Sequence, residues 1–233
     1  MDKHDDQTPK RTFSHYGFFQ FTQSYWQQEE SQRRSFLKEF IKSIPELSEK
    51  AYLYSIFPTR SEADLMVWNS FIVENSKDAG KFFSRAASKI SNWRQFLKPV
   101  ETLWGFTRPS VYASGKSSQE LNPFQNQRRP YLVVYPFVKT SEWYLMSKES
   151  RQEMMNEHIR VGRQYPQITQ LLLYSTGLQD QEFVVVYETD DLALFSNLVT
   201  ALRSTEGRKY TLRDTPIYTS IHQTPEQIMT AWL

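Results

Sequence analysis

The chain has 233 residues, enough for one large domain or two fused small ones with a substantial core. Its 28 Lys and Arg residues nearly balance 26 Asp and Glu, so the net charge of +2 disfavours a nucleic-acid partner. It has no cysteine, which excludes disulfides, zinc fingers, iron–sulfur clusters and thiolate-ligated haem, and leaves His or carboxylate side chains as the ligands of any metal.

The first half of the chain predicts an α+β unit. Residues 1–12 are charged and polar and are expected to be a disordered arm without the apolar core of a signal peptide. Hydrophobic periodicity then predicts a strand, a helix, two strands, a helix and an extended segment at Phe13–Phe21, Glu29–Ile44, Ala51–Phe57, Asp64–Val73, Ser76–Phe96 and Leu103–Ala113.

The second half repeats this order after a polar linker, residues 114–130, that contains Gly and Pro. It predicts a strand, a mostly helical stretch, two strands, a helix and a strand at Tyr131–Lys139, Ser141–Tyr165, Ile168–Tyr174, Glu182–Glu188, Asp191–Ser204 and Pro216–Ile221. Residues 223–233 form a tail, in which Pro225–Leu233 is expected to be a short amphipathic turn that packs on a neighbouring subunit. No segment approaches ~18 consecutive apolar residues, so we expect no membrane span and a cytoplasmic protein.

Residue matches between the halves favour an internal duplication. Ser24-Tyr25-Trp26 corresponds to Ser141-Glu142-Trp143, Tyr54-Ser55 to Tyr174-Ser175, and Asp64-Leu65-Met66-Val67 to Glu182-Phe183-Val184-Val185, at offsets of 117, 120 and 118 residues. The predicted fold class is α+β, with two fused ferredoxin-like βαββαβ repeats (13–113 and 131–222) whose antiparallel sheets share a core, as in a dimeric α+β barrel. The alternative is two generic α+β halves that match by chance.

His158 is the one histidine of four that lies within a strongly periodic predicted helix. Its neighbours on the same helix face are Met154, Met155, Val161 and Gly162, so the imidazole projects from an apolar stripe. Gly162 costs ~1 kcal/mol relative to Ala inside a helix, and one reason to keep it is room for a flat group beside the histidine. The alternative is a core histidine with a helix-packing glycine. A haem-type iron held by His158 would need a second group to orient the imidazole, and Glu206 is the candidate.

Several segments resemble the chlorite dismutase-like haem proteins, and in particular their coproheme decarboxylase branch. They are Ala63-Asp64-Leu65-Met66 with Trp68, Arg108-Pro109-Ser110-Val111-Tyr112, Arg129-Pro130-Tyr131, Tyr135-Pro136 through Lys139 with Trp143, Met155-Asn156-Glu157-His158, Ser175-Thr176-Gly177-Leu178, Asp190-Asp191, and Leu202-Arg203 through Glu206. They span about residues 13–221 in the family's order. The resemblance implies haem b or iron coproporphyrin III in the C-terminal half, and a ring-shaped homo-oligomer, with a pentamer favoured.

Carried over by position, His158 matches the proximal iron ligand of this family. Lys139 and Trp143 match residues at the proximal edge of the haem, where a lysine can pair with the propionates. Met155 belongs to the same helix face and is counted with the cofactor-binding residues. Lys139 could instead be a solvated lysine at the end of a strand.

The distal residue separates the chemistries of this family. Chlorite dismutases resemble one another in having an arginine there, whereas this chain has Gln170 when counted back from Ser175, or Leu171 when counted forward from His158. Strand alternation puts Gln170 and Leu171 on opposite faces, and Gln170 is the favoured candidate.

Tyr135 matches the tyrosine that forms a radical in coproheme decarboxylases, although it could be a packed strand residue. The resemblance therefore predicts a haem-dependent enzyme that uses hydrogen peroxide to convert ferric coproporphyrin III into haem b, with Tyr135, Lys139 and Gln170 as catalytic residues. The alternatives are a haem carrier or sensor, a weak peroxidase, and a chlorite dismutase, which the missing distal arginine disfavours.

Overall fold

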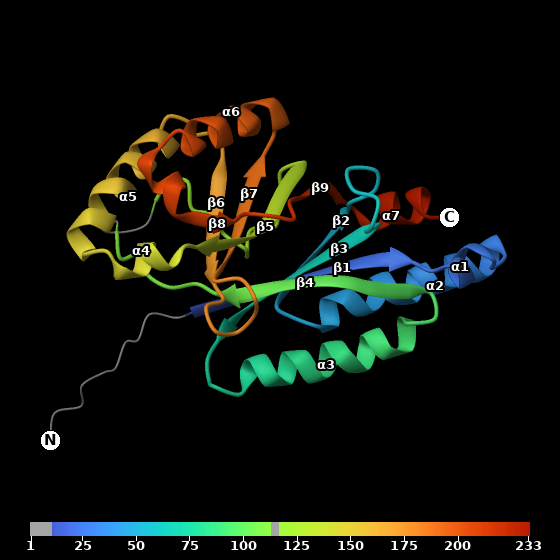
Figure 1. Ribbon diagram of the computed structural model, residues 1–233. Helices are drawn as coiled ribbons and strands as arrows, with labels where there is room; N and C mark the ends of the chain where they lie inside the picture. Colours follow the sequence, from blue (N-terminus) through green and yellow to red (C-terminus); the bar gives the residue numbers. More distant parts are fainter. Residues whose placement is uncertain (1–10, 113–116) are drawn as a thin grey trace, which may run out of the picture.

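The computed structural model describes residues 11–112 and 117–233, and its first half forms a ferredoxin-like repeat (Figure 1). Its elements are β1 (Arg11–Phe21), α1 (Gln23–Trp26), α2 (Glu30–Ser43), the 3₁₀ turn η1 (Ile44–Glu46), β2 (Lys50–Ser55), β3 (Leu65–Val73), α3 (Asp78–Trp93) and β4 (Leu97–Phe106). The strands pair antiparallel in the order β4-β1-β3-β2.

The second half has the same order of elements and the same strand order, β9-β5-β7-β6. Its elements are β5 (Tyr131–Lys139), α4 (Ser141–Leu145), α5 (Lys148–Gly162), β6 (Thr169–Tyr174), β7 (Phe183–Thr189), α6 (Leu192–Arg203), the 3₁₀ turn η2 (Glu206–Tyr210), β8 (Thr211–Arg213), β9 (Tyr218–Gln223) and α7 (Pro225–Ala231). The predicted fold class is thereby confirmed, whereas the exact domain boundaries stay predictions.

The two sheets join edge to edge into a closed ring of eight strands. β2 pairs with β9 over three residue pairs, and β4 meets β6 at the single pair of Phe106 and Tyr174. Side chains reinforce the junction of β4 and β6, which we call the second seam of the barrel. Gln179 donates from Nε2 to the Thr102 carbonyl at 2.9 Å and accepts a hydrogen bond from the Trp104 amide at its Oε1, at 3.0 Å. The Ser175 hydroxyl donates to the Trp104 carbonyl.

Gly105 lets the two repeats approach closely at this seam. A Cβ on Gly105 would stand 2.7 Å from the Tyr174 carbonyl oxygen and from the Ser175 hydroxyl, closer than real Cβ contacts. Gly177, two residues after Ser175, has a φ of 75°, which favours glycine. The Ser175-Thr176-Gly177 segment thus lies at the junction of β4 and β6 that closes the barrel.

Three apolar layers make up the core. The barrel interior is filled by residues of both repeats, among them Tyr16, Phe18, Trp68, Leu132, Leu171 and Val186. The buried cluster between the first sheet and α2 and α3 has eighteen residues, whereas the cluster between the second sheet and α6 has three, Ile168, Tyr187 and Leu198. The two helical layers lie on opposite sides of the barrel (Figure 1).

Three local predictions differ from the structure. β4 begins at Leu97, six residues before the predicted start, and includes Pro99, which lies at a register shift opposite Phe19, where a proline is tolerated. The predicted extended segment also ends early, at Phe106, and Ala113 lies outside the described residues. The helical stretch from Ser141 is two helices, separated at Met146 and Ser147.

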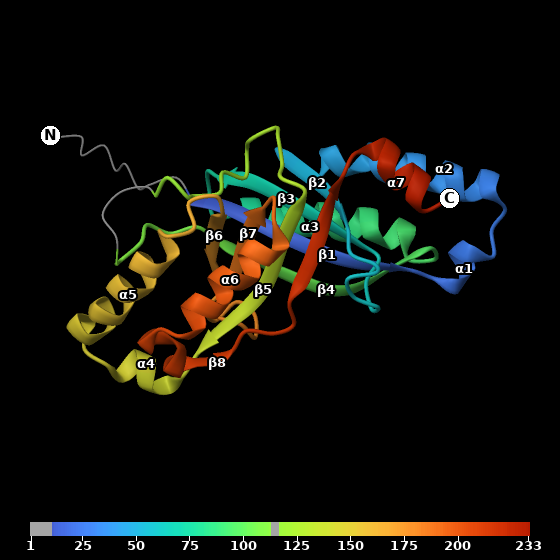
Figure 2. The ribbon, with the colours of Figure 1, turned by 90° about the horizontal axis from the view of Figure 1, so that it is seen from above.

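The tail was expected on a neighbouring subunit, but it packs on its own chain. Ile228 and Trp232 belong to the core layer of the first repeat, and the Tyr25 hydroxyl donates to the Trp232 carbonyl at 2.5 Å. Figure 2 shows α7 alongside α2. Within the described part of the chain, no helix has the length and apolar character needed to cross a membrane.

Candidate functional site

The two repeats differ most in what their long helices bury. α2 buries Leu37, Phe40 and Ser43 against its sheet, whereas α5 buries none of its residues. Opposite α5, Leu172 on the outer face of β6 is 44% exposed. A Cβ built on Gly162 would meet no atom within 4 Å outside its own helical turn. α5 is therefore packed less completely than α2, and there is open space beside Gly162.

His158 stands where the first repeat has a core phenyl ring. The offset of 118 residues that relates the first residues of α2 and α5 places His158 at the position of Phe40, which is fully buried against Trp93. Burial lowers the pKa of His158 to about 4, with a contribution from the nearby Lys139 charge. The imidazole is therefore neutral near pH 7 and offers a nitrogen lone pair, as an iron ligand must.

Lys139 reaches the same layer from the end of β5. Its ammonium lies 3.9 Å from the ring centroid of Trp143, a buried residue of α4. The ammonium also donates a hydrogen bond to the Gly207 carbonyl at 3.3 Å. Burial lowers the pKa of Lys139 to about 8, while Glu182 opposes the shift. A lysine held this way is a cation that a ligand carboxylate can approach.

The affinity for a carboxylate-bearing porphyrin should therefore depend on the protonation of Lys139. We expect the affinity for ferric coproporphyrin III to fall by about tenfold between pH 7 and pH 9, because Lys139 is charged below its pKa and loses its proton as the pH rises through about 8. Absorbance titrations at the two pH values measure this. Lys139→Arg should bind equally at both, since a guanidinium stays charged; an equal loss in the variant contradicts the assignment.

Tyr135 lies on the outer face of β5, four residues before Lys139. It is half-buried and packs on the layer formed by Ile168, Tyr187 and Leu198. Burial raises its pKa well above the usual value, with smaller contributions from Tyr187 and Asp214. The phenol is consequently neutral over the physiological range and keeps its O–H hydrogen.

Gln170 and Leu171 lie on opposite faces of β6, as strand alternation predicts. Leu171 is 5% exposed inside the barrel, whereas Gln170 is exposed on the outer face. The main chain of Gln170 is fixed by two hydrogen bonds of 2.8 Å, with the Gln119 carbonyl and the Leu121 amide. Of the two distal candidates, Gln170 is therefore the one whose face the second-repeat helices cover.

Met155 and Glu206 are less closely tied to His158. Met155 is half-buried on α5, one turn before the histidine. The Glu206 carboxylate pairs with Lys209 at 2.6 Å, and the Glu206 amide donates to the Glu157 carboxylate at 2.9 Å. No hydrogen bond joins Glu206 to His158 among the described residues, so its orienting role stays a prediction that requires the carboxylate to leave Lys209.

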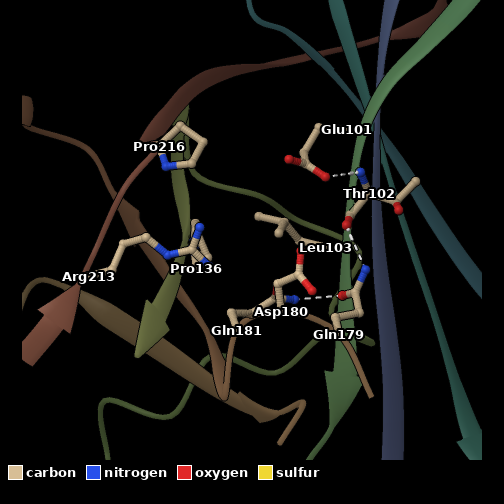
Figure 3. Close-up of a pocket in the computed structure, with 9 residues that line it drawn as sticks. All are labelled: Glu101, Thr102, Leu103, Pro136, Gln179, Asp180, Gln181, Arg213 and Pro216. Carbon is tan, nitrogen blue, oxygen red and sulfur yellow. Dashed lines mark hydrogen bonds between the residues drawn. The ribbon is translucent and has the colours of Figure 1, made fainter. Parts of the chain in front are cut away.

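Figure 3 shows a separate pocket of about 240 Å³. Pro136, which alternates with Tyr135 along β5, lines it together with Glu101, Thr102, Leu103, Gln179, Asp180, Gln181, Arg213 and Pro216. Because Tyr135 and Pro136 point to opposite faces of the strand, this pocket is distinct from the layer that contains His158.

Two neighbours of the candidate residues were missed from the sequence. Glu182 accepts the Lys139 amide at 2.7 Å, and Tyr187 packs beside Tyr135 with ring centroids 6.3 Å apart. Both lie on or next to β7, and their contacts cross from one strand to another. Strand alternation within Phe183–Thr189 places Tyr187 on the outer face, but only the pairing register shows which residues it meets.

Fold and site together define a duplicated α+β barrel protein whose two helical layers differ in packing. Residues 30–223 match the chlorite dismutase family. The chain is 30% identical over 172 residues to the coproheme decarboxylase of Mycolicibacterium smegmatis. The aligned region covers 72% of this chain and 70% of that protein. The chain belongs to the chlorite dismutase family, whose members are haem-dependent enzymes, and the predicted family is confirmed.

Solved structures agree on the fold. The chlorite dismutase of Candidatus Nitrospira defluvii in complex with imidazole has a TM-score of 0.79 at 21% identity, covering 95% of this chain and 94% of that one. A double mutant of the same enzyme has a TM-score of 0.79 at 24% identity, covering 95% of both chains.

Proposed function

We propose that this protein binds an iron porphyrin in the layer between α5 and the outer face of β5, β6 and β7, with His158 as the iron ligand. The observation that carries this proposal is the neutral imidazole of His158 in the place that a phenyl ring fills in the first repeat. The surroundings fit a flat apolar group with carboxylates: Leu172 is exposed, Gly162 leaves space, and Lys139 supplies a cation.

The activity we propose is peroxide-dependent decarboxylation of ferric coproporphyrin III to haem b. Each propionic acid side chain and one hydrogen peroxide give a vinyl group, carbon dioxide and two water molecules. When bound, the iron supplies the two-electron reduction of the peroxide. The relationship to a coproheme decarboxylase and the residues at positions 135, 139 and 170 support this choice.

The protein's own residues have separate tasks in this reaction. Lys139 holds a propionate by charge, and Tyr135, once oxidised, takes a hydrogen atom from the propionate chain. His158 anchors the porphyrin from α5, while the neutral amide of Gln170 lies on the opposing sheet. The ring-shaped pentamer and the cytoplasmic location stay predictions alongside this function.

Chlorite decomposition is the second enzymatic candidate because the family and its solved relatives carry that name. An anionic oxidant is best held by a fixed positive charge on the distal side. The outer face of β6 carries Gln170, Leu172 and Tyr174, none of which is a cation. Decarboxylation, which acts on the porphyrin's own carboxylates, makes no such demand. A carrier or sensor that binds porphyrin without turnover is the non-enzymatic candidate.

Reconstitution separates these candidates. The protein loaded with ferric coproporphyrin III should lose two carboxyl groups on titration with hydrogen peroxide, and mass spectrometry of the extracted porphyrin measures this. The same sample given chlorite should evolve little oxygen. An unchanged porphyrin mass after peroxide rejects the decarboxylase, and rapid oxygen release from chlorite would establish the second candidate instead. Binding with neither reaction indicates the carrier.

A further inference from the structure

Tyr187 lies between the two candidate catalytic side chains on the sheet. It pairs directly with Gln170 across β6 and β7, and it faces Val133 on β5, two residues from Tyr135. All three side chains occupy the outer face, so Tyr187 is a direct neighbour of Gln170 and a diagonal neighbour of Tyr135. Tyr187 is farther than Tyr135 from the Lys139 end of the strand.

The two phenols are in contact. Their rings are nearly parallel, with an interplanar angle of 24° and centroids 6.3 Å apart. The two neighbouring phenols also perturb each other's ionisation, since Tyr187 raises the pKa of Tyr135 and Tyr135 lowers the pKa of Tyr187.

The surroundings of Tyr187 keep its phenol neutral and shielded from solvent. Its side chain is 5% exposed and packs on Phe195 of α6 with ring centroids 5.2 Å apart. Burial raises the pKa of Tyr187 to about 12. A phenol that cannot ionise loses an electron only together with its proton, and the oxygen of Tyr135 is the partner that can take both.

We propose that Tyr187 is a second redox-active phenol, which exchanges a hydrogen atom with oxidised Tyr135. The O–H bond of Tyr187 breaks and an O–H bond of Tyr135 forms, so that one electron and one proton move together and the unpaired electron passes to Tyr187. The oxidant is a hydroperoxide consumed at the bound porphyrin iron, and the proposal rests on the proposed function for that reaction and for Tyr135.

This exchange lets the site hold the unpaired electron reversibly on Tyr187. While the unpaired electron is on Tyr187, Tyr135 is an intact phenol and the porphyrin side chains are spared an untimely attack. The return of the hydrogen atom to Tyr187 restores the reactive Tyr135. Gln170, directly opposite Tyr187, has an amide that can accept or donate a hydrogen bond to the phenol in either state.

The test replaces Tyr187 with 3-aminotyrosine, an isosteric phenol that is oxidised more easily and traps the unpaired electron. The protein is loaded with haem b, which lacks the two reactive propionates of coproporphyrin, mixed with hydrogen peroxide and frozen for electron paramagnetic resonance. The matched control is Tyr165→3-aminotyrosine, because Tyr165 packs on the same layer without a ring contact to Tyr135 among the described residues.

We expect an aminotyrosyl signal at position 187 at least about tenfold stronger than at position 165, and a loss of at least about tenfold when Tyr135→Phe is added. Equal signals at 187 and 165, or a signal at 187 that survives Tyr135→Phe, overturn the proposal. The resonance signal does not depend on decarboxylation. A failure of the proposed decarboxylase activity would appear in the mass spectrum of the coproporphyrin, not in the aminotyrosyl signal.

Discussion

Replacing His158 by alanine is expected to abolish stable binding of ferric coproporphyrin III and of haem b, with a loss of affinity of at least about 100-fold. Even indirect supports of a metal ligand are worth about 10- to 100-fold, and this change removes the ligand itself. Among the face neighbours of His158 on α5, which are Met154, Met155, Val161 and Gly162, none carries an imidazole. Titration of the Soret band with native and variant protein measures the loss.

His222→Ala is the matched control for this experiment. It makes the same deletion at a histidine on β9, which packs against Tyr54 with ring centroids 5.4 Å apart, away from α5. The control should bind porphyrin as the native protein does. Added imidazole should restore a Soret band to His158→Ala. Native-like binding by His158→Ala would show that the iron is held elsewhere.

Tyr135→Phe is expected to bind ferric coproporphyrin III normally and to lose carboxyl removal by at least about 100-fold in rate. Phenylalanine keeps the ring that packs on Ile168, Tyr187 and Leu198 but has no O–H hydrogen to lose. Binding should persist because the iron ligand and the lysine remain. Stopped-flow mixing with peroxide, followed by mass spectrometry of the porphyrin, separates the two steps.

Tyr131→Phe provides the comparison on the same strand and the same face, at the far end from Lys139. We expect its rate to stay within about twofold of native, as for surface changes away from the reacting atoms. If both variants decarboxylate at the native rate, Tyr135 is a packing residue and another group must take the hydrogen atom.

Periodicity was enough to predict the elements whose apolar residues are local in sequence. β1, α2, β3 and α6 begin and end within two residues of their predicted bounds. β4 differs most, because it begins six residues before its predicted start and includes Pro99, which lies at a shift in register with β1. Such a shift belongs to a pair of strands far apart in the chain and has no local signal.

The candidate site divides along the same line. The face of α5 that carries His158, and the face of β5 that Tyr135 shares with Lys139, could be predicted because each depends on a single helix or strand. The hydrogen bond from the Glu206 amide to the Glu157 carboxylate, and the contact of Tyr187 with Tyr135, depend on how segments far apart in the chain meet. The choice between Gln170 and Leu171 needed the barrel, because only its closure defines which face of β6 is interior.

The unequal filling of the two helical layers has a consequence for the ligand itself. In the first repeat, Phe40 and Trp93 complete a hydrophobic core that the chain provides for itself. In the second, His158 takes the corresponding place, and the porphyrin that we propose to bind there would serve as an exchangeable part of the core. If this porphyrin is also the substrate, the second repeat would lose its core contacts with the ligand each time the product leaves. Product release and local loosening of the second repeat would then be one event.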